Sequence, residues 1–270
     1  MKQSIGKKIY RRLIDVIKDT IYLGPLFLLQ NIFFIFSRKG VYRLHIAGVG
    51  SLLVRRNSSD VHVIRQIFRE REYDLSRFPA HAERLQKFHD DIVLSGKIPL
   101  IVDAGANNGC SAIWFSLMFP KSKIVAIEPD PDNFHVCSVN IATRGNIEPI
   151  EGAIGGEPGS VVLDRTAQSD WAVKTHRSAR GRQVEIVTVE KILNQMGDGY
   201  QLFLVKIDIE GFESDLFSSR TEWLDQVFAV LIEPHDWMLP GRHSSAPLQS
   251  AMGARRFELL ISGENLLYVK

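Results

Sequence analysis

The sequence predicts an α/β protein: a doubly wound, mainly parallel sheet that ends in an antiparallel strand pair and is preceded by an N-terminal helical segment. Two observations support this prediction. From residue 96 onward, apolar runs of strand length alternate with helical stretches, a pattern typical of parallel sheets covered on both faces. In residues 257–269, two apolar runs are separated by Ser262-Gly263-Glu264-Asn265, which is typical of two strands joined by a turn.

We divide the chain into three parts. Residues 1–40 form a basic and apolar helical segment, residues 41–95 a lead-in segment, and residues 96–270 the alternating α/β domain. A composition of 45% hydrophobic and 24% charged residues is that of an ordinary folded protein. The two cysteines exclude a disulfide framework or a cysteine zinc site, so a reducing, cytoplasmic location is expected.

The N-terminal segment carries much of the positive charge. Residues 1–40 contain eight Lys and Arg and two Asp, so this segment is strongly basic although the whole chain has a net charge of only +2. The rest of the chain is therefore acidic on balance, which argues against nucleic acid as a partner. The apolar run at 23–36 is shorter than the roughly 20 residues of a transmembrane helix. Two interpretations stay open: a basic amphipathic helix on the inner face of a membrane, and a pair of helices packed on protein.

The lead-in segment is expected to begin with two short strands around Gly48-Val49-Gly50. Residues 57–60 (NSSD) have the composition of a turn and helix N-cap, and helical spacing follows over 61–68. A further helix is expected over about residues 80–94, where Ser95-Gly96-Lys97 ends it.

The main domain has five segments that predict parallel strands. They lie at 98–103, 123–128, 147–151, 202–208 and 227–232. The clearest helices between them are 111–119 and 133–143. Between residues 160 and 189 we expect a second, short strand pair. The basic residues on its connection are interpreted as a solvated loop, and they are Lys174, His176, Arg177, Arg180 and Arg182.

A glycine-rich loop follows the first of these strands. The strand ends at Asp103, residues 104–109 (AGANNG) form the loop, and a helix starts near Ser111. Such a turn lets a ligand approach the backbone closely and offers it the free N–H groups of a helix N-terminus. Loops of this kind bind dinucleotides as well as S-adenosylmethionine.

Three details favour S-adenosylmethionine. A dinucleotide loop needs glycine at the position of Asn107, because a larger residue obstructs the pyrophosphate. Asp103 would attract the positive amine of the methionine tail, whereas it would repel a pyrophosphate. Glu128 ends the second strand about 20 residues beyond Gly105, the spacing at which an acid holds ribose hydroxyls, and Asp130 follows it.

The candidate catalytic residues follow the fourth and fifth parallel strands. Asp208 and Glu210 alternate with apolar residues, so both project from one face of a regular strand together with Lys206. His235 lies just after the fifth strand, within residues 233–236 (EPHD). The carboxyl ends of parallel strands are where ligands bind in such sheets.

If the acceptor is a hydroxyl, it has to lose its proton as it attacks a methyl sulfonium, so a base is expected among these residues. His235 is the expected base, since an imidazole titrates near neutral pH. Asp208 and Glu210 would either orient the hydroxyl or hold a divalent cation that lowers its pKa, and the sequence does not decide between these roles. Structural roles are the alternative: Asp208 would support the cofactor tail, Glu210 would cap the following helix, and His235 would bond to a backbone carbonyl.

Three motifs resemble the FkbM family of S-adenosylmethionine-dependent methyltransferases. They are residues 101–109 (IVDAGANNG), 127–133 (IEPDPDN) and 205–216 (VKIDIEGFESDL). The resemblance covers about residues 50–260, whereas residues 1–40 lie outside the family's common pattern. It implies a Rossmann-like fold and an O-methyltransferase that acts on a hydroxyl of a small-molecule, sugar or lipid-linked acceptor.

Carried over onto this chain, the resemblance also implies a set of cofactor-binding residues. The methionine end of the cofactor would be lined by Asp103, Gly105, Asn107 and Gly109. Glu128 would hold the ribose with Asp130 beside it, and the residues bordering the adenine would be Gly152 and Ala153.

Two other functions stay open at this point. An NAD(P)-dependent oxidoreductase would use a similar loop, although Asn107 and Asp103 argue against it. A non-catalytic, membrane-attached module would retain the fold without turnover, although the intact candidate residues argue against such decay. Residues 208–211 (DIEG) replace the Asn/Asp-Pro-Pro-aromatic signature of amino-methyltransferases, which argues against methylation of a nucleobase nitrogen.

Overall fold

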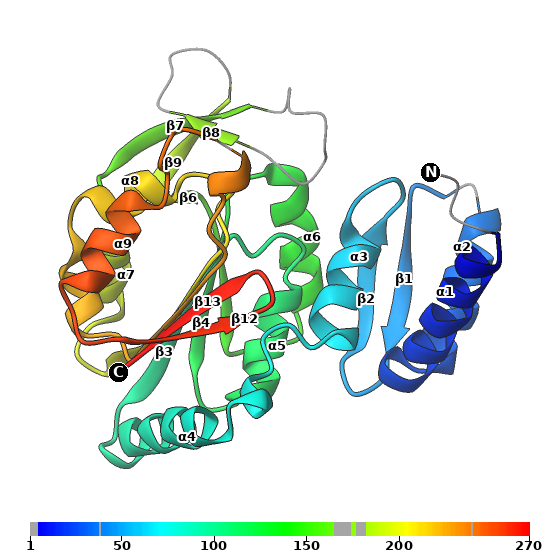
Figure 1. Ribbon diagram of the computed structural model, residues 1–270, viewed down its shortest axis with the longest axis horizontal. Coiled ribbons are helices and arrows are strands. Elements are labelled where there is room, and N and C mark those ends of the chain that lie inside the picture. The colour runs from blue at the N-terminus through cyan, green and yellow to red at the C-terminus, as the bar shows by residue number, and fades with distance from the viewer. Residues whose placement is uncertain (1–4, 38, 165–173, 177–181, 239) are drawn as a thin grey trace. The chain divides into compact units, whose positions relative to one another are not determined.

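The computed structural model describes residues 5–37, 39–164, 174–176, 182–238 and 240–270. The chain divides into two compact units, residues 1–73 and 74–270 (Figure 1). The lead-in segment expected at 41–95 is therefore shared between them. Its strands belong to the first unit together with the N-terminal helices, and its last helix belongs to the second.

The first unit combines N-terminal helices with a strand hairpin. α1 (Ile5–Lys18) continues through a π-helical turn (Asp19–Leu23), and α2 (Pro25–Phe36) begins after Gly24. The hairpin is formed by the antiparallel strands β1 (Val41–Ile46) and β2 (Gly50–Arg55), as the sequence predicts. The unit ends in α3 (Asp60–Ile64) and a second π-helical segment (Arg65–Arg69).

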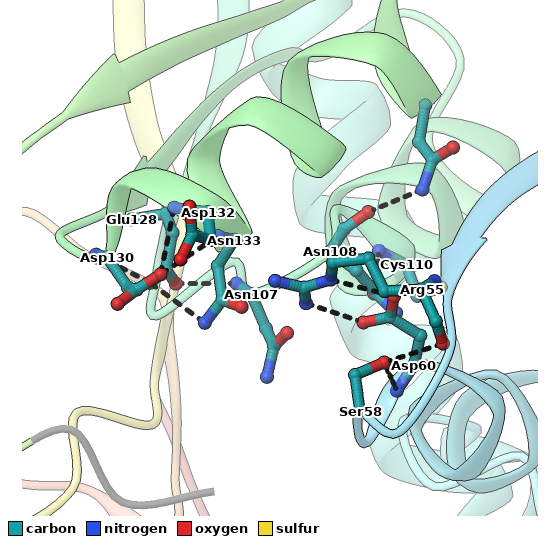
Figure 2. Close-up of polar contacts among 11 residues, drawn as sticks. Arg55, Ser58, Asp60, Asn107, Asn108, Cys110, Glu128, Asp130, Asp132 and Asn133 are labelled. Carbon is teal, nitrogen blue, oxygen red and sulfur yellow. Dashed lines mark hydrogen bonds and ion pairs between the residues drawn. The ribbon is translucent and has the colours of Figure 1, made fainter. Parts of the chain in front are cut away.

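Buried carboxylates hold this first unit together. Asp19 is 1% exposed, and its carboxylate accepts hydrogen bonds from Arg65 at 2.6 Å and from Arg69 at 2.9 Å. Asp60 is fully buried and accepts from the backbone N–H and the guanidinium of Arg55, each at 2.7 Å (Figure 2). The helix α3 begins at Asp60, within the segment predicted to form the N-cap. The Asp60 carboxylate binds Arg55, however, and no side chain caps the helix.

The outer surface of α1 and α2 is apolar. Most of the large apolar side chains exposed in the described part of the chain lie in α1, α2 and the π-helical turn between them, including Tyr10, Leu13, Ile17, Ile21, Phe33 and Phe36. Across the described residues, no helix has both the length and the apolar character needed to cross a membrane.

The second unit is built on a seven-stranded sheet with the order β12-β13-β11-β10-β3-β4-β5 (Figure 1). Its parallel strands are β3 (Ile98–Ala104), β4 (Lys123–Glu128), β5 (Ile147–Glu151), β10 (Tyr200–Ile207) and β11 (Ala229–Ile232). β13 (Asn265–Val269) pairs antiparallel with both β11 and β12 (Glu258–Ser262). The predicted fold class is confirmed, including the antiparallel pair at the end.

Helices cover both faces of this sheet, which explains why β3 and β10 are apolar along nearly their whole length. α7 (Val189–Met196), α8 (Glu213–Ser218) and α9 (Ala246–Gly253) pack on one face against a shared apolar core. The helices on the other face are α4 (Pro79–Leu94), α5 (Cys110–Met118) and α6 (Pro131–Ile141) (Figure 1). β3 lies between β10 and β4, so the chain order reverses beside β3, where such sheets bind ligands.

A second, smaller sheet follows β5. Its four strands are β6 (Ala153–Ile154), β7 (Gly159–Asp164), β8 (Lys174–His176) and β9 (Gln183–Val187), in the order β6-β9-β7-β8. The sequence predicted only a strand pair here. Lys174 and His176 belong to β8 and not to a connection, while Arg177 and Arg180 lie outside the described residues.

Candidate active site

The glycine-rich loop after β3 depends on two glycines. Gly105 has a φ of +79°, and a Cβ atom there would lie 1.8 Å from the carbonyl oxygen of Asp208. Gly109 has a φ of +85° and precedes α5, where a Cβ would lie 3.1 Å from Cys137 Sγ. The first glycine therefore lets the loop cross the end of β10, and the second lets α5 pack closely against α6. Asn107 also has a positive φ, of 49°, which asparagine tolerates better than most residues.

Asp103 does not reach the surface of the loop. Its side chain is fully buried, and one carboxylate oxygen accepts a hydrogen bond from Ser111 Oγ at 2.6 Å. The other lies 3.3 Å from the ammonium nitrogen of Lys206, its register partner on β10. The neighbouring strand thus supplies a positive charge to Asp103, and the expected contact between Asp103 and the amine of a methionine tail stays a prediction.

Glu128, at the end of β4, is held by backbone N–H groups (Figure 2). Its carboxylate accepts from Asn107 N–H at 2.8 Å and from Asp130 N–H at 2.9 Å. Burial raises the pKa of Glu128 to about 7, although these hydrogen bonds lower it. Asp130 itself caps α6, since its Oδ1 accepts from the N–H groups of Asp132 and Asn133.

A pocket at the carboxyl ends of β3, β4 and β10 joins most of the predicted cofactor residues to two of the predicted catalytic ones. It is lined by Gly105, Asn107, Ile127, Glu128, Pro129, Asn133, Gly152, Ala153, Ile154, Asp208, Ile209, Glu210 and Phe212. Three predicted cofactor-binding residues are absent from this lining: Asp103, Gly109 and Asp130. Each has instead a structural role in positioning the loop or the helix next to it.

A wider groove lies at the opposite edge of the sheet. It is bordered by Tyr200 and Leu202 of β10, together with Trp223 and Phe228. None of the predicted site residues lines it. Because parallel sheets bind ligands at their carboxyl ends, we place the active site in the pocket at Gly105.

Beside that pocket, His235 brings together acids from two neighbouring strand ends. Its Nε2 atom lies 3.7 Å from Asp208 Oδ1, 3.7 Å from Glu233 Oε1 and 3.9 Å from Glu210 Oε2. Its Nδ1 atom lies 2.6 Å from Glu213 Oε1, and both His235 and Glu213 are buried. Glu210 itself adopts a positive φ of 53° in the turn before Gly211.

The environment of this cluster changes the expected division of roles. Burial and the neighbouring Asp208 raise the pKa of Glu210 to about 8. Burial lowers the pKa of His235, but the hydrogen bond to Glu213 and the surrounding carboxylates more than offset this and raise it to about 9. Both pKa values lie above neutral pH, so they do not separate the two groups. Glu210 lines the pocket and His235 does not, so Glu210 is better placed to take a proton from an acceptor there.

Sequence reasoning missed several residues of this site. Glu213 lies within the motif 205–216 and Asn133 within the motif 127–133, but nothing in either pattern marked them as site residues. Lys206 was noted only as a neighbour on the strand face. Phe212 also lies within the motif 205–216 and lines the pocket, but nothing in the pattern distinguished it.

Comparison with known proteins identifies the family of this chain. Residues 103–246 match the Methyltransferase FkbM domain, which is more than half of the chain. The chain belongs to the FkbM methyltransferase family. Together with the sheet topology and the loop after β3, this establishes an S-adenosylmethionine-dependent methyltransferase with a Rossmann-like fold.

Two curated relatives are similar in sequence. Methyltransferase 1 of Beauveria bassiana (strain ARSEF 2860) is 25% identical over 193 residues, covering 63% of this chain and 71% of that protein. Methyltransferase sdnD of Sordaria araneosa is 31% identical over 89 residues, covering 33% of this chain and only 28% of that protein.

Solved structures are more distant. Precorrin-6y C5,15-methyltransferase from Geobacter metallireducens GS-15 has a TM-score of 0.36 and 11% identity, covering 64% of this chain and 79% of that one. Fibrillarin from Aeropyrum pernix, solved with natively bound S-adenosyl-L-methionine, has a TM-score of 0.37 and 11% identity, covering 64% and 66% of the two chains. At these values the family assignment rests on the FkbM domain match alone.

Proposed function

We propose that this methyltransferase transfers the methyl group to a hydroxyl of a small-molecule, sugar or lipid-linked acceptor. The observation that supports an oxygen acceptor is that Glu210 and Asp208 line the same pocket as Gly105 and Glu128. An alcohol has to lose its proton as it attacks, and a base whose pKa lies near the working pH is the most effective. Glu210, with a pKa of about 8, meets this requirement.

The pocket also fits the cofactor that the family uses. Bound S-adenosylmethionine supplies the activated methyl group. In this proposal Gly105 and Asn107 border its amino-acid end, Glu128 accepts hydrogen bonds from the ribose hydroxyls, and Gly152 and Ala153 border the adenine. Support comes from the buried Glu128 carboxylate, which two backbone N–H groups hold in place at the pocket wall.

On the acceptor side, Glu210, His235 and Glu213 have different roles in this proposal. Glu210 takes the proton of the acceptor hydroxyl as the oxygen forms its new bond to carbon. The imidazole of His235, whose Nε2 is 3.9 Å from Glu210 Oε2, lies among the carboxylates of the cluster and helps to position them. Glu213 binds His235 and accepts a hydrogen bond from Gly211 N–H, and it does not line the pocket, so we regard it as a positioning residue.

The decisive experiment combines cofactor binding with methyl transfer. S-adenosylhomocysteine, but neither NAD nor NADP, should raise the melting temperature of the full chain. Labelled methyl from S-adenosylmethionine should be transferred to hydroxyl compounds and not to analogues that carry an amine or a methoxy group in place of the hydroxyl. Glu210→Gln should lower kcat by about 10²–10⁴-fold while S-adenosylhomocysteine affinity stays near wild type. Transfer to the amine analogue, with none to the hydroxyl, would overturn the oxygen assignment.

We also propose that residues 5–36 contact the anionic, cytoplasmic face of a membrane. The exposed apolar side chains of α1 and α2 occur next to exposed basic residues such as Lys7 and Arg12. Apolar burial in the interface and attraction to anionic lipids would act together on such a surface. A membrane location would also suit a lipid-linked acceptor.

A further inference from the structure

Three side chains of the cluster around His235 lie close enough together to bind one ion. One potential ligand atom each from Asp208, Glu233 and His235 lies within 4.8 Å of the other two. The distances from His235 Nε2 to the nearest oxygens of Asp208 and Glu233 are both 3.7 Å, too long for direct hydrogen bonds. The three side chains come from the ends of two adjacent parallel strands, β10 and β11, so the sheet itself fixes their separation.

The orientation of the imidazole is a second and independent observation. His235 is 3% exposed, and its Nδ1 is paired with Glu213 Oε1 at 2.6 Å. This leaves Nε2 directed at the carboxylates, where it makes no hydrogen bond to any residue that the structure describes. A metal-binding histidine almost always has its other ring nitrogen bonded to a carboxylate, carbonyl or water, which fixes the tautomer and the ring. Glu213 fills that position here.

The negative charge of the cluster around His235 also favours a bound cation. Four carboxylates, those of Asp208, Glu210, Glu213 and Glu233, lie within 4.0 Å of this one imidazole. Glu213 Oε2 is buried without a hydrogen-bond partner among the described residues. A buried carboxylate oxygen without a donor is costly, so a further positive charge at this cluster would stabilise it.

We propose that Asp208, Glu233 and His235 bind a divalent cation at the wall of the cofactor pocket. In an octahedral site with bonds of about 2.1 Å, neighbouring ligand atoms lie about 3 Å apart and opposite ones about 4.2 Å apart. The 3.7 Å distances from His235 Nε2 to Asp208 Oδ1 and Glu233 Oε1 lie between these two values, and the side chains of both acids are only partly buried. Two carboxylates and one imidazole suit Mg²⁺ or Mn²⁺, and three protein ligands leave coordination positions open.

Asp208 lines the pocket, so a cation on this residue would be able to bind an acceptor oxygen and lower the pKa of its hydroxyl. That role rests on the proposed function. The site itself does not, because the binding of a cation is measured without an acceptor.

Manganese is a suitable probe because its paramagnetism reports free and bound ion directly. The full chain, first freed of metal with a chelator, is titrated with Mn²⁺ by electron paramagnetic resonance and calorimetry, in the presence of S-adenosylhomocysteine. We expect one ion per chain, and Mg²⁺ should compete for it. Glu233→Gln should weaken Mn²⁺ binding by about 10–100-fold, and Glu213→Gln, which acts through His235, should weaken it less.

Glu148→Gln is the matched control, because Glu148 is an exposed acid paired with Lys123 on the same sheet and away from the cluster. This variant should bind Mn²⁺ like the wild type. Melting curves establish that each variant is folded, and Asp208→Asn replaces Glu233→Gln if the latter unfolds. Absence of one-to-one Mn²⁺ binding in the wild type, or equal affinity in the folded Glu233→Gln or Asp208→Asn variant, overturns the site. A chain that binds Mn²⁺ but methylates no hydroxyl would overturn the proposed function and leave the site standing.

Discussion

The ammonium nitrogen of Lys206 lies 3.3 Å from a carboxylate oxygen of Asp103, and both side chains are buried. Lys206 also donates a hydrogen bond to the carbonyl oxygen of Gly105 at 2.7 Å. The two residues are register partners on β10 and β3, so the ion pair connects the first turn of the cofactor loop to the strand that carries the acceptor side. The pair supports the site without lining the pocket.

Lys206→Met should be strongly destabilising, because it leaves the Asp103 charge buried without its cation. Breaking a buried ion pair on one side costs about 3–5 kcal/mol, and we expect the free energy of unfolding in urea to fall by about that amount. The double variant Lys206→Met/Asp103→Asn removes both charges and should recover much of the loss. A single variant as stable as the wild type would show that Asp103 does not depend on Lys206.

Cofactor affinity should depend on pH through Glu128. Burial raises the pKa of this carboxyl to about 7, above its ordinary value near 4.5, so the folded, cofactor-free chain binds the proton more tightly than the unfolded chain does. The contribution of this group to stability is therefore fully present below pH 4.5 and is lost as the pH rises through 7. Ribose hydroxyls need the charged carboxylate, so S-adenosylhomocysteine should bind about tenfold more weakly at pH 6 than at pH 8.

Calorimetry across this pH range checks the expectation, and proton release on binding below pH 7 is its second signature. Glu128→Gln provides the control, since the amide does not titrate: its affinity should be lower at pH 8 and nearly constant between pH 6 and pH 8. A wild-type affinity that does not vary with pH would mean that Glu128 is already charged in the free enzyme or does not contact the cofactor.

Gly105→Ala should disrupt the loop. The new Cβ would lie 1.8 Å from the backbone oxygen of Asp208, and the φ of +79° is unfavourable for any residue with a side chain. The conformational term alone is worth about 1–3 kcal/mol, and the clash with backbone adds to it. We expect a lower melting temperature and loss of S-adenosylhomocysteine binding. Gly145→Ala, where a Cβ would meet no atom within 4 Å, should behave like the wild type.

The proposed membrane surface can be tested by flotation. The full chain should float with anionic liposomes, less with neutral ones, and high salt should release part of it. Phe33→Glu/Phe36→Glu should reduce flotation at least several-fold, because both side chains are exposed and apolar. Leu94→Glu is the matched control: Leu94 is 83% exposed and Phe36 82%, but Leu94 lies at the end of α4. Equal flotation of both variants, or a shift to dimers without lipid binding, would favour helices that pack on protein.

Much of the second unit followed from local patterns. The strands β3 and β4 are largely apolar runs bounded by polar turns, and such runs identify buried parallel strands at any position in a chain. The loop at 104–109 was recognisable because its glycines and its place between a strand and a helix are both local. The short β8 was missed because three residues carry too little pattern.

The sequence by itself determined the fold class, the cofactor loop and the acid Glu128, since each depends on residues adjacent in the chain. Only the tertiary structure decided what Asp103 and His235 do. Asp103 is paired with Lys206, a residue of another strand. Burial lowers the pKa of His235, but the neighbouring carboxylates of Glu213, Asp208 and Glu210 raise it. Ionisation depends on burial and on charges within a few ångströms, and those distances exist only after strands far apart in the sequence have paired.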